Sequence, residues 1–155
     1  MGGAALGTGR GEKLTPIEVG GTFHWVFAVA DGGLSTPAVY GEFDRLTAGM
    51  EVPEPTASPA LLAALRSGDS GALAGALSND LQPAALSLRP PLADTLAAGT
   101  EAGALAALVS GSGPTTAFLV PDEETAEKVA AALLTSGTCR NARVAVSPAP
   151  GAHVI

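Results

Sequence analysis

The sequence has few of the residues that usually build a functional site. It contains one cysteine, Cys139, which excludes an internal disulfide, and with only two histidines in 155 residues we expect no metal site. Aromatic residues make up 4% of the chain while apolar residues make up 46%. The core must therefore consist mainly of Leu, Val and Ala, with a few aromatic anchors.

Positive charge is also scarce. Eight Lys and Arg residues stand against fifteen Asp and Glu residues, giving a net charge of −7 without any basic cluster. Nucleic acids and anionic membranes bind basic surfaces, so we expect neither as a partner. No apolar run is long enough to span a membrane, and the first residues lack the basic flank and apolar core of a signal peptide. A cytoplasmic protein is the default expectation.

What the chain does contain is a series of short apolar runs bounded by turn residues. We expect strands over residues 23–30, 105–109, 117–120 and 143–146, and a helix over 122–135. Their order predicts an α+β fold, a ferredoxin-like antiparallel sheet covered on one side by helices. Residues 2–12 hold five glycines and are either a flexible leader or a short strand entering a bulged turn. Residues 13–19 are expected to form an edge strand, because a proline in them cannot donate to a ladder.

A helix is expected to begin at Thr36. Its hydroxyl would cap an N–H group, and Pro37 would occupy the first helical position. Val39, Phe43 and Leu46 would form the buried stripe. Tyr40 falls one residue off that stripe, at the edge of the buried face in the first turn. Its ring either packs at the rim of the core or is available for stacking.

Further short helices are expected to begin at Ser58, at Asp69, at 79–80 and at 90–91. Asn79 and Asp80 are better explained as helix caps than as catalytic groups. These helices are rich in alanine and offer small contact surfaces.

A glycine-rich turn joins the two expected strands 105–109 and 117–120. It reads Ser110, Gly111, Ser112, Gly113 and Pro114, followed by two threonines. The glycines permit positive φ and close approach by another group, and such a loop can direct successive N–H groups toward an anion. Taken alone, the pattern is better explained as an ordinary glycine-rich hairpin turn.

Four separated segments together resemble one family. Residues 2–12, 35–40, 78–83 and 108–115 occur in the order found in the C-terminal half of the 4-diphosphocytidyl-2-C-methyl-D-erythritol kinase family, within the GHMP kinase superfamily. The resemblance implies phosphoryl transfer from ATP, with Mg²⁺, to a hydroxyl of a cytidine-diphosphate substrate in non-mevalonate isoprenoid biosynthesis. It implies that Ser110–Pro114 lies beside the phosphate, that Thr36 and Pro37 line the cytidine pocket, and that Tyr40 stacks on the cytosine. Residues 7–12 would match the strand that follows the family's catalytic aspartate.

The resemblance also implies that this chain lacks several functional elements of the family. The family's ATP-binding loop, N-terminal lysine and catalytic aspartate all lie upstream of the position that matches Met1, and Asp31, Asp44 and Asp80 do not match that aspartate. We therefore expect no catalytic residue in this chain, which is a truncation, a misplaced start or a genuine half-protein. Residues 1–22 would belong to the N-terminal kinase domain and 23–155 to the C-terminal domain. Apolar surface exposed by the missing half would favour self-association through residues 2–19.

One interpretation that remains open is a structural or interaction fragment whose missing half is supplied by another chain. Two alternatives for the binding function also remain open. One is a non-catalytic ferredoxin-like module that binds a nucleotide or another anion at Ser110–Pro114. The other is a different GHMP kinase, acting on a mevalonate-type substrate or on homoserine. Residues 7–12 and 35–40 argue against the second.

Overall fold

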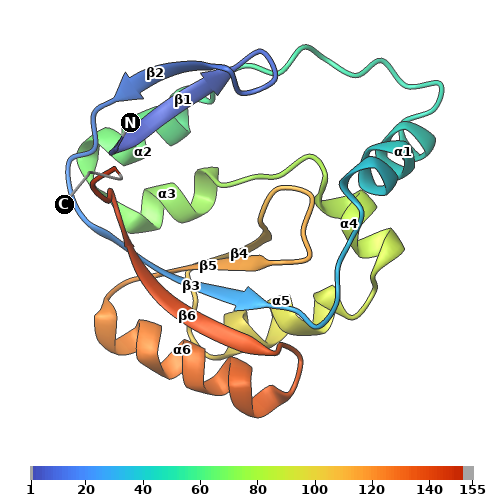
Figure 1. Cartoon of the computed structure of the whole chain (residues 1–155). Coiled ribbons are helices and arrows are strands. Elements are labelled where there is room, and N and C mark those ends of the chain that lie inside the picture. Colours follow the sequence, from blue (N-terminus) through green and yellow to red (C-terminus); the bar gives the residue numbers. More distant parts are fainter. Residues whose placement is uncertain (1, 152–155) are drawn as a thin grey trace.

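A four-stranded antiparallel sheet forms the centre of the molecule (Figure 1). The structure is a computed structural model that describes residues 2–151, so the last four residues of the expected 23–155 domain lie outside it. The strands are β3 (Phe23–Val29), β4 (Ala106–Val109), β5 (Thr116–Val120) and β6 (Asn141–Ser147). Their spatial order is β4-β5-β3-β6, and every neighbouring pair is antiparallel. The chain passes from β3 through helices to β4 and β5, and then through one helix to β6, which is the ferredoxin-like connection. The predicted α+β fold is confirmed.

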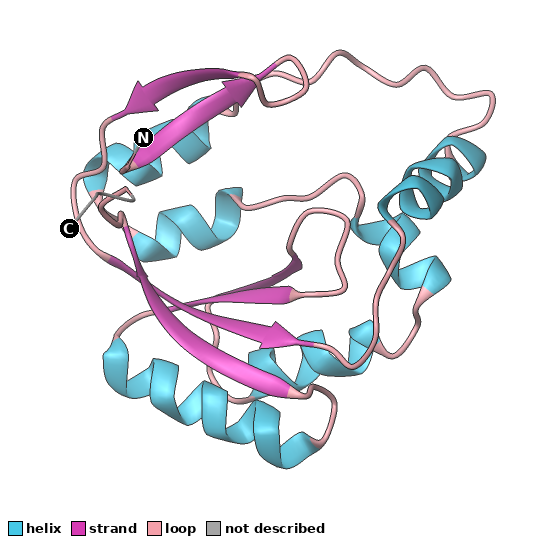
Figure 2. Ribbon diagram, in the orientation of Figure 1, coloured by secondary structure: helices cyan, strands magenta, loops and turns pink. Residues whose placement is uncertain are grey.

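Six helices are present in residues 2–151. They are α1 (Thr36–Leu46), α2 (Pro59–Ser67), α3 (Ser70–Ala76), α4 (Gln82–Leu88), α5 (Leu92–Glu101) and α6 (Glu123–Ser136). Helices α5 and α6 lie along one face of the sheet (Figure 2). The predicted inner face of α6 is confirmed, because it is buried against alternate residues of β3 and β5. This cluster contains Val26, Ala28, Phe118, Val120, Ala126, Val129, Ala130 and Leu133.

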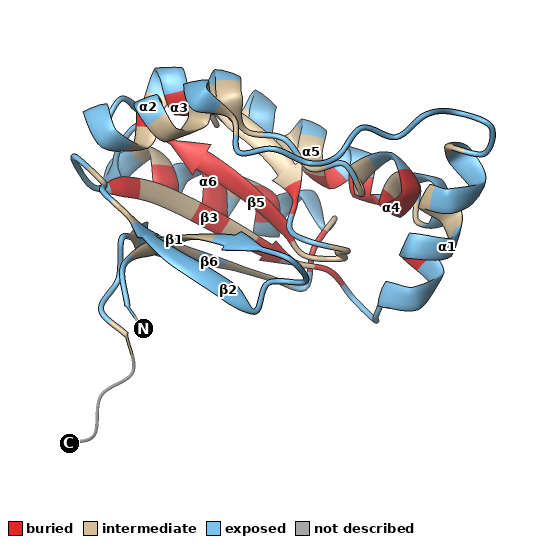
Figure 3. Ribbon diagram, turned by 90° about the horizontal axis from the view of Figure 1, so that it is seen from above, coloured by how far each residue is buried: buried red, intermediate tan, exposed pale blue. Residues whose placement is uncertain are grey.

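The opposite face of the sheet is also partly covered, which corrects the expectation of helices on one side only. Phe23 of β3 and Leu119 of β5 pack against Ala64 of α2 and Leu73 of α3. The reason is the pattern of β3, whose alternate residues are apolar on both sides, so that each face requires a cover. On the same face, Trp25 and Phe27 of β3 are only half buried. Figure 3 shows buried and intermediate segments alternating along β3.

The N-terminal residues form a separate β-hairpin. Strands β1 (Ala4–Thr8) and β2 (Lys13–Ile17) pair with each other in a two-stranded sheet. The strand alternative for residues 2–12 is therefore confirmed and the flexible leader is not. The hairpin is joined to the rest by the N–H of Gly3, which donates to the carbonyl of Ala149 at 2.8 Å. Within residues 2–151 we find no helix with the length and apolar character needed to cross a membrane.

Most of the helix starts predicted from capping residues are confirmed. Ser58, Asp69 and Asp122 each accept a backbone N–H at the start of α2, α3 and α6. The N-cap of α1 is one residue earlier than predicted, because Ser35 rather than Thr36 accepts the N–H of Ala38. The buried stripe of α1 is also shorter than predicted, since Leu46 is 41% exposed.

Candidate functional site

The glycine-rich turn between β4 and β5 closes on itself. The N–H of Ser110 donates to the carbonyl of Thr115 at 2.8 Å, and the N–H of Gly113 donates to the carbonyl of Ser110 at 3.0 Å. Gly111 and Gly113 have φ values of 59° and 78°, where a side chain is strained. The predicted row of N–H groups facing an anion is thus reduced, because two of them serve the loop's own closure. Gly111 still borders open space, since a Cβ built there would meet nothing within 4 Å.

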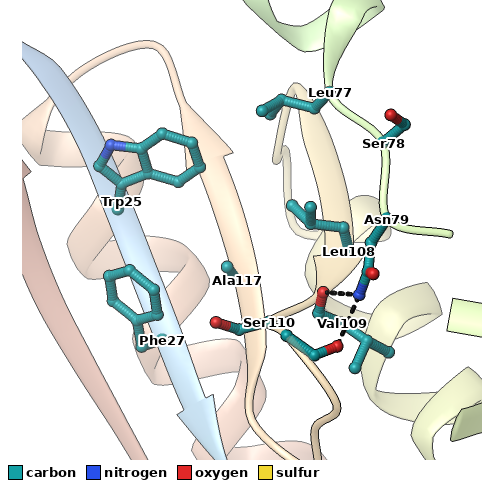
Figure 4. A pocket seen from close by; sticks show the side chains of 10 residues that line it. Trp25, Phe27, Leu77, Ser78, Asn79, Leu108, Val109, Ser110 and Ala117 are labelled. Atoms are coloured by element: carbon teal, nitrogen blue, oxygen red, sulfur yellow. Dashed lines mark hydrogen bonds between the residues drawn. The ribbon is translucent and has the colours of Figure 1, made fainter. Parts of the chain in front are cut away.

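One flank of this loop borders a pocket of about 360 Å³ (Figure 4). Its wall on the sheet side consists of Trp25 and Phe27 of β3, whose rings stack with centroids 6.4 Å apart. The Trp25 indole N–H donates to the Ser147 hydroxyl at 2.9 Å, which fixes the ring. Ser110 and Gly111 form the loop side of the pocket. The result is an apolar, aromatic wall beside a polar loop, which is the usual composition of a small-molecule site.

A second pocket, of about 570 Å³, adjoins the first. It lies between the β1–β2 hairpin and the segment 54–58, and both pockets are lined by Leu77 and Ser78. Gly7, Thr8 and Gly9 line it from the hairpin. The structure therefore brings part of the predicted segment 7–12 to a hollow that meets the glycine loop's pocket.

The other flank of the loop contacts the start of α1. The hydroxyls of Thr36 and Ser112 lie 2.8 Å apart and share a hydrogen bond. Two of the predicted site segments, 76 residues apart in sequence, are thus in direct contact. Tyr40 lies one helical turn after Thr36 and is 54% exposed, so more than half of its surface is accessible to solvent. Neither Pro37 nor Tyr40 lines the pocket that contains Trp25.

Helix α1 is joined to α4 through Glu42. Glu42 accepts two hydrogen bonds from Arg45, both at 2.7 Å, and a third from the Ser87 hydroxyl of α4. The Arg45 guanidinium and the Ser87 hydroxyl lower the pKa of Glu42 from 4.5 to about 2. Below these polar contacts, Val39 is fully buried against Ala84 and Ala85 of α4.

The segment that leads from β3 into α1 is held by Arg89. Its guanidinium donates to the carbonyls of Asp31 and Gly33. The segment before α1 is therefore restrained by Arg89, and Thr36, the first residue of α1, is restrained by Ser112.

Sequence reasoning missed three residues of the site. Trp25 and Phe27 fall within the predicted strand 23–30, and only the tertiary arrangement leaves them at the pocket. Asn79 and Asp80 were assigned as helix caps, which is wrong, because the N-cap of α4 is Leu81 and no side chain caps that helix. Asn79 Oδ1 accepts the N–H of Leu81 at 3.0 Å in the turn before the helix. Its Nδ2 donates instead to the carbonyls of Val109 and Gly111, at 2.7 and 2.8 Å (Figure 4).

The fold and the sequence together define the class of protein. The chain belongs to the GHMP kinase family, because the family model described as "GHMP kinases C terminal" matches residues 61–138. The match includes α2 to α6, the glycine loop and Asn79.

Individual relatives show which GHMP kinases this chain is similar to. A 4-diphosphocytidyl-2-C-methyl-D-erythritol kinase of Streptomyces avermitilis is 76% identical over 155 residues, which is 100% of this chain and 52% of that protein. A kinase of the same name from Thermobifida fusca is 59% identical over 100% of this chain and 50% of its own length. The chain spans about half the length of the curated relatives it matches.

Solved structures show the same architecture. A crystal structure of 4-(cytidine 5'-diphospho)-2C-methyl-D-erythritol kinase superposes with a TM-score of 0.71 at 26% identity, over 92% of this chain and 48% of that one. A homoserine kinase from Cytophaga hutchinsonii superposes with a TM-score of 0.69 at 22% identity, over 94% of this chain and 48% of that one. At this identity the second likeness shows the fold alone.

Proposed function

We propose that this chain forms the substrate-binding half of a kinase that transfers phosphate from ATP to 4-diphosphocytidyl-2-C-methyl-D-erythritol, in non-mevalonate isoprenoid biosynthesis. The observation that carries the proposal is the hydrogen bond between Thr36 and Ser112. It joins the segment proposed to bind cytidine to the loop proposed to lie beside the phosphate. The names of relatives up to 76% identical support the same reaction.

In this proposal the two flanks of the loop have different tasks. Thr36, Pro37 and Tyr40 bind the cytidine end of the substrate, with the exposed Tyr40 ring stacked on the base. The loop Ser110, Gly111, Ser112, Gly113 and Pro114 holds the end that reacts. Because phosphoryl transfer depends mainly on positioning and on electrostatic stabilisation, a rigid connection between these flanks is useful in itself.

ATP and Mg²⁺ belong to the proposed reaction, but the residues of this chain do not fit them unaided. No Lys or Arg lines the pocket beside the glycine loop, and in residues 2–151 no group of three or more His, Cys, Asp and Glu residues could hold a metal. We therefore propose that the phosphate-binding cations and the catalytic acid come from the half of the kinase that this chain does not span. Residues 1–22 would complete that half, and 23–155 would form the C-terminal domain. A cytoplasmic location, and the lack of nucleic-acid and membrane partners, remain predictions.

The test is a fused enzyme, in which the N-terminal half of the Streptomyces avermitilis relative is joined ahead of this chain. Phosphorylation of 4-diphosphocytidyl-2-C-methyl-D-erythritol, mevalonate and homoserine is measured in parallel with a coupled ADP assay. We expect turnover of the cytidine substrate only. Turnover of mevalonate or homoserine instead would contradict the proposed substrate, and a fused enzyme that folds but transfers no phosphate would contradict the proposed function.

A further inference from the structure

The start of α4 holds the glycine loop by its base. Val109, the last residue of β4, has its N–H bonded to Oε1 of Gln82 at 2.8 Å and its carbonyl bonded to Nδ2 of Asn79 at 2.7 Å. Strand β4 lies at the edge of the sheet, with β5 on one side. The side chains of Asn79 and Gln82 thus satisfy the backbone groups of Val109 that a neighbouring strand would otherwise bond. Asn79 also bonds the carbonyl of Gly111, within the loop.

The Asn79 side chain uses both ends of its amide. Its oxygen accepts the N–H of Leu81 at the entry to α4, while its nitrogen donates to the two carbonyls at the start of the loop. The bond to Leu81 alone requires only an acceptor, which the side chains of Ser and Asp also provide. An amide is required only because the loop presents carbonyl oxygens, which accept and cannot donate. Donation to the loop is therefore a separate task from the bond in the turn before α4.

The loop is also held at its tip, by the hydroxyl pair of Thr36 and Ser112. Base and tip are restrained from two different helices, α4 and α1, which are themselves joined through Glu42 and Ser87. A loop fixed at both points has a defined position relative to the cytidine end of the site. A displacement of about 1 Å at a reacting group can cost on the order of 100-fold in rate.

We propose that Asn79 is a positioning residue of the kinase reaction, which sets the place of the glycine loop through its bonds to Val109 and Gly111. This inference rests on the proposed function, because it assumes that the loop lies beside the transferred phosphate. It also makes a claim that does not depend on activity, namely that the amide nitrogen of Asn79 limits opening of the loop.

Two isosteric substitutions separate the loss of the hydrogen bonds that Asn79 donates to the loop from the other effects of a substitution near the loop. Asn79→Asp keeps the acceptor for Leu81 but replaces the donor by an oxygen that faces two carbonyls. Gln82→Glu adds the same negative charge three residues away and keeps its acceptor for the N–H of Val109. Two measurements are made: backbone amide exchange of residues 110–115 in this chain, and kcat and KM of the fused enzyme.

We expect Asn79→Asp to speed exchange in the loop and to lower kcat by about tenfold or more, the effect of losing roughly one hydrogen bond's net free energy. KM for the cytidine substrate should change less than twofold, because α1 still holds the cytidine. Gln82→Glu should leave exchange and kcat within about twofold of the parent, because its hydrogen bond from the N–H of Val109 is kept.

Equal exchange and equal kcat in the two variants would overturn the proposal. A fall in melting temperature of Asn79→Asp with unchanged kcat would also overturn it, because that is the result of a purely structural role. If the parent fused enzyme transfers no phosphate, the proposed function fails, and the exchange rates still decide whether Asn79 holds the loop. If Asn79→Asp does not fold, Asn79→Ser replaces it, since serine keeps an acceptor but is too short to reach both carbonyls.

Discussion

Tyr40 offers a test of the cytidine site that can be separated from folding. The ring is 54% exposed on the first turn of α1, so truncating it removes little of the buried core. Stacking of a base on an aromatic ring contributes roughly 1–3 kcal/mol, which is about 5-fold to 150-fold in affinity. We therefore expect Tyr40→Ala in the fused enzyme to weaken CMP binding by about tenfold or more, and Tyr40→Phe to bind nearly as the parent does.

The assay is isothermal titration of CMP at a temperature well below the melting point of each variant. Thermal unfolding is recorded on the same samples as the control for folding. Unchanged CMP affinity in Tyr40→Ala would refute the stacking role. If Tyr40→Phe weakens binding as much as Tyr40→Ala does, the hydroxyl and not the ring makes the contact, and the stacking assignment is wrong.

Three further predictions concern folding and association. Gly99→Ala should lower the free energy of unfolding by about 1–3 kcal/mol, because the added Cβ would lie 2.2 Å from the buried ring of Phe118. Denaturant titration measures this change, with Gly41→Ala as the control. A Cβ at Gly41 meets nothing within 4 Å, so that variant should gain up to about 1 kcal/mol from helix propensity. The pKa of Glu42 is lowered from 4.5 to about 2 in the fold, so its contribution to stability is present above pH 4.5 and is lost as the pH falls toward 2. The difference in unfolding free energy between the parent and Glu42→Gln should therefore shrink over that pH range. A constant difference would contradict the hydrogen bonds assigned to Glu42. The β1–β2 hairpin should mediate self-association, and Leu14→Lys, at a position 50% exposed, should reduce it in sedimentation velocity runs; a monomeric parent would count against this.

Much of the fold could be predicted because it depends on local signals. The strands follow from period-2 apolar patterns, and α6 follows from Asp122 at its start, its inner stripe and Gly137 at its end. The end of α2 is likewise marked by Gly68, which adopts the left-handed conformation there. Such features involve residues within a few positions of one another, and a single sequence contains them directly.

The parts that were missed depend on contacts between distant segments. Ser35 and Thr36 are both good caps, and the choice of Ser35 leaves Thr36 for Ser112, 76 residues away. The second task of Asn79 depends on carbonyls 30 and 32 residues downstream, whose position follows only from the packing of α4 beside β4. A residue that satisfies a simple local role gives no sequence signal of a second, long-range one.

The central claim is that this chain supplies the substrate side of a kinase and not its catalytic side. It is tested most directly by measuring phosphorylation of 4-diphosphocytidyl-2-C-methyl-D-erythritol with this chain alone and with the fused enzyme, at equal concentration with ATP and Mg²⁺. The account predicts turnover by the fused enzyme and none above background by the chain alone, because positioned cations and a catalytic acid together lower the barrier by many kcal/mol. Robust turnover by the chain alone would contradict it, since the catalytic groups would then lie among these 155 residues.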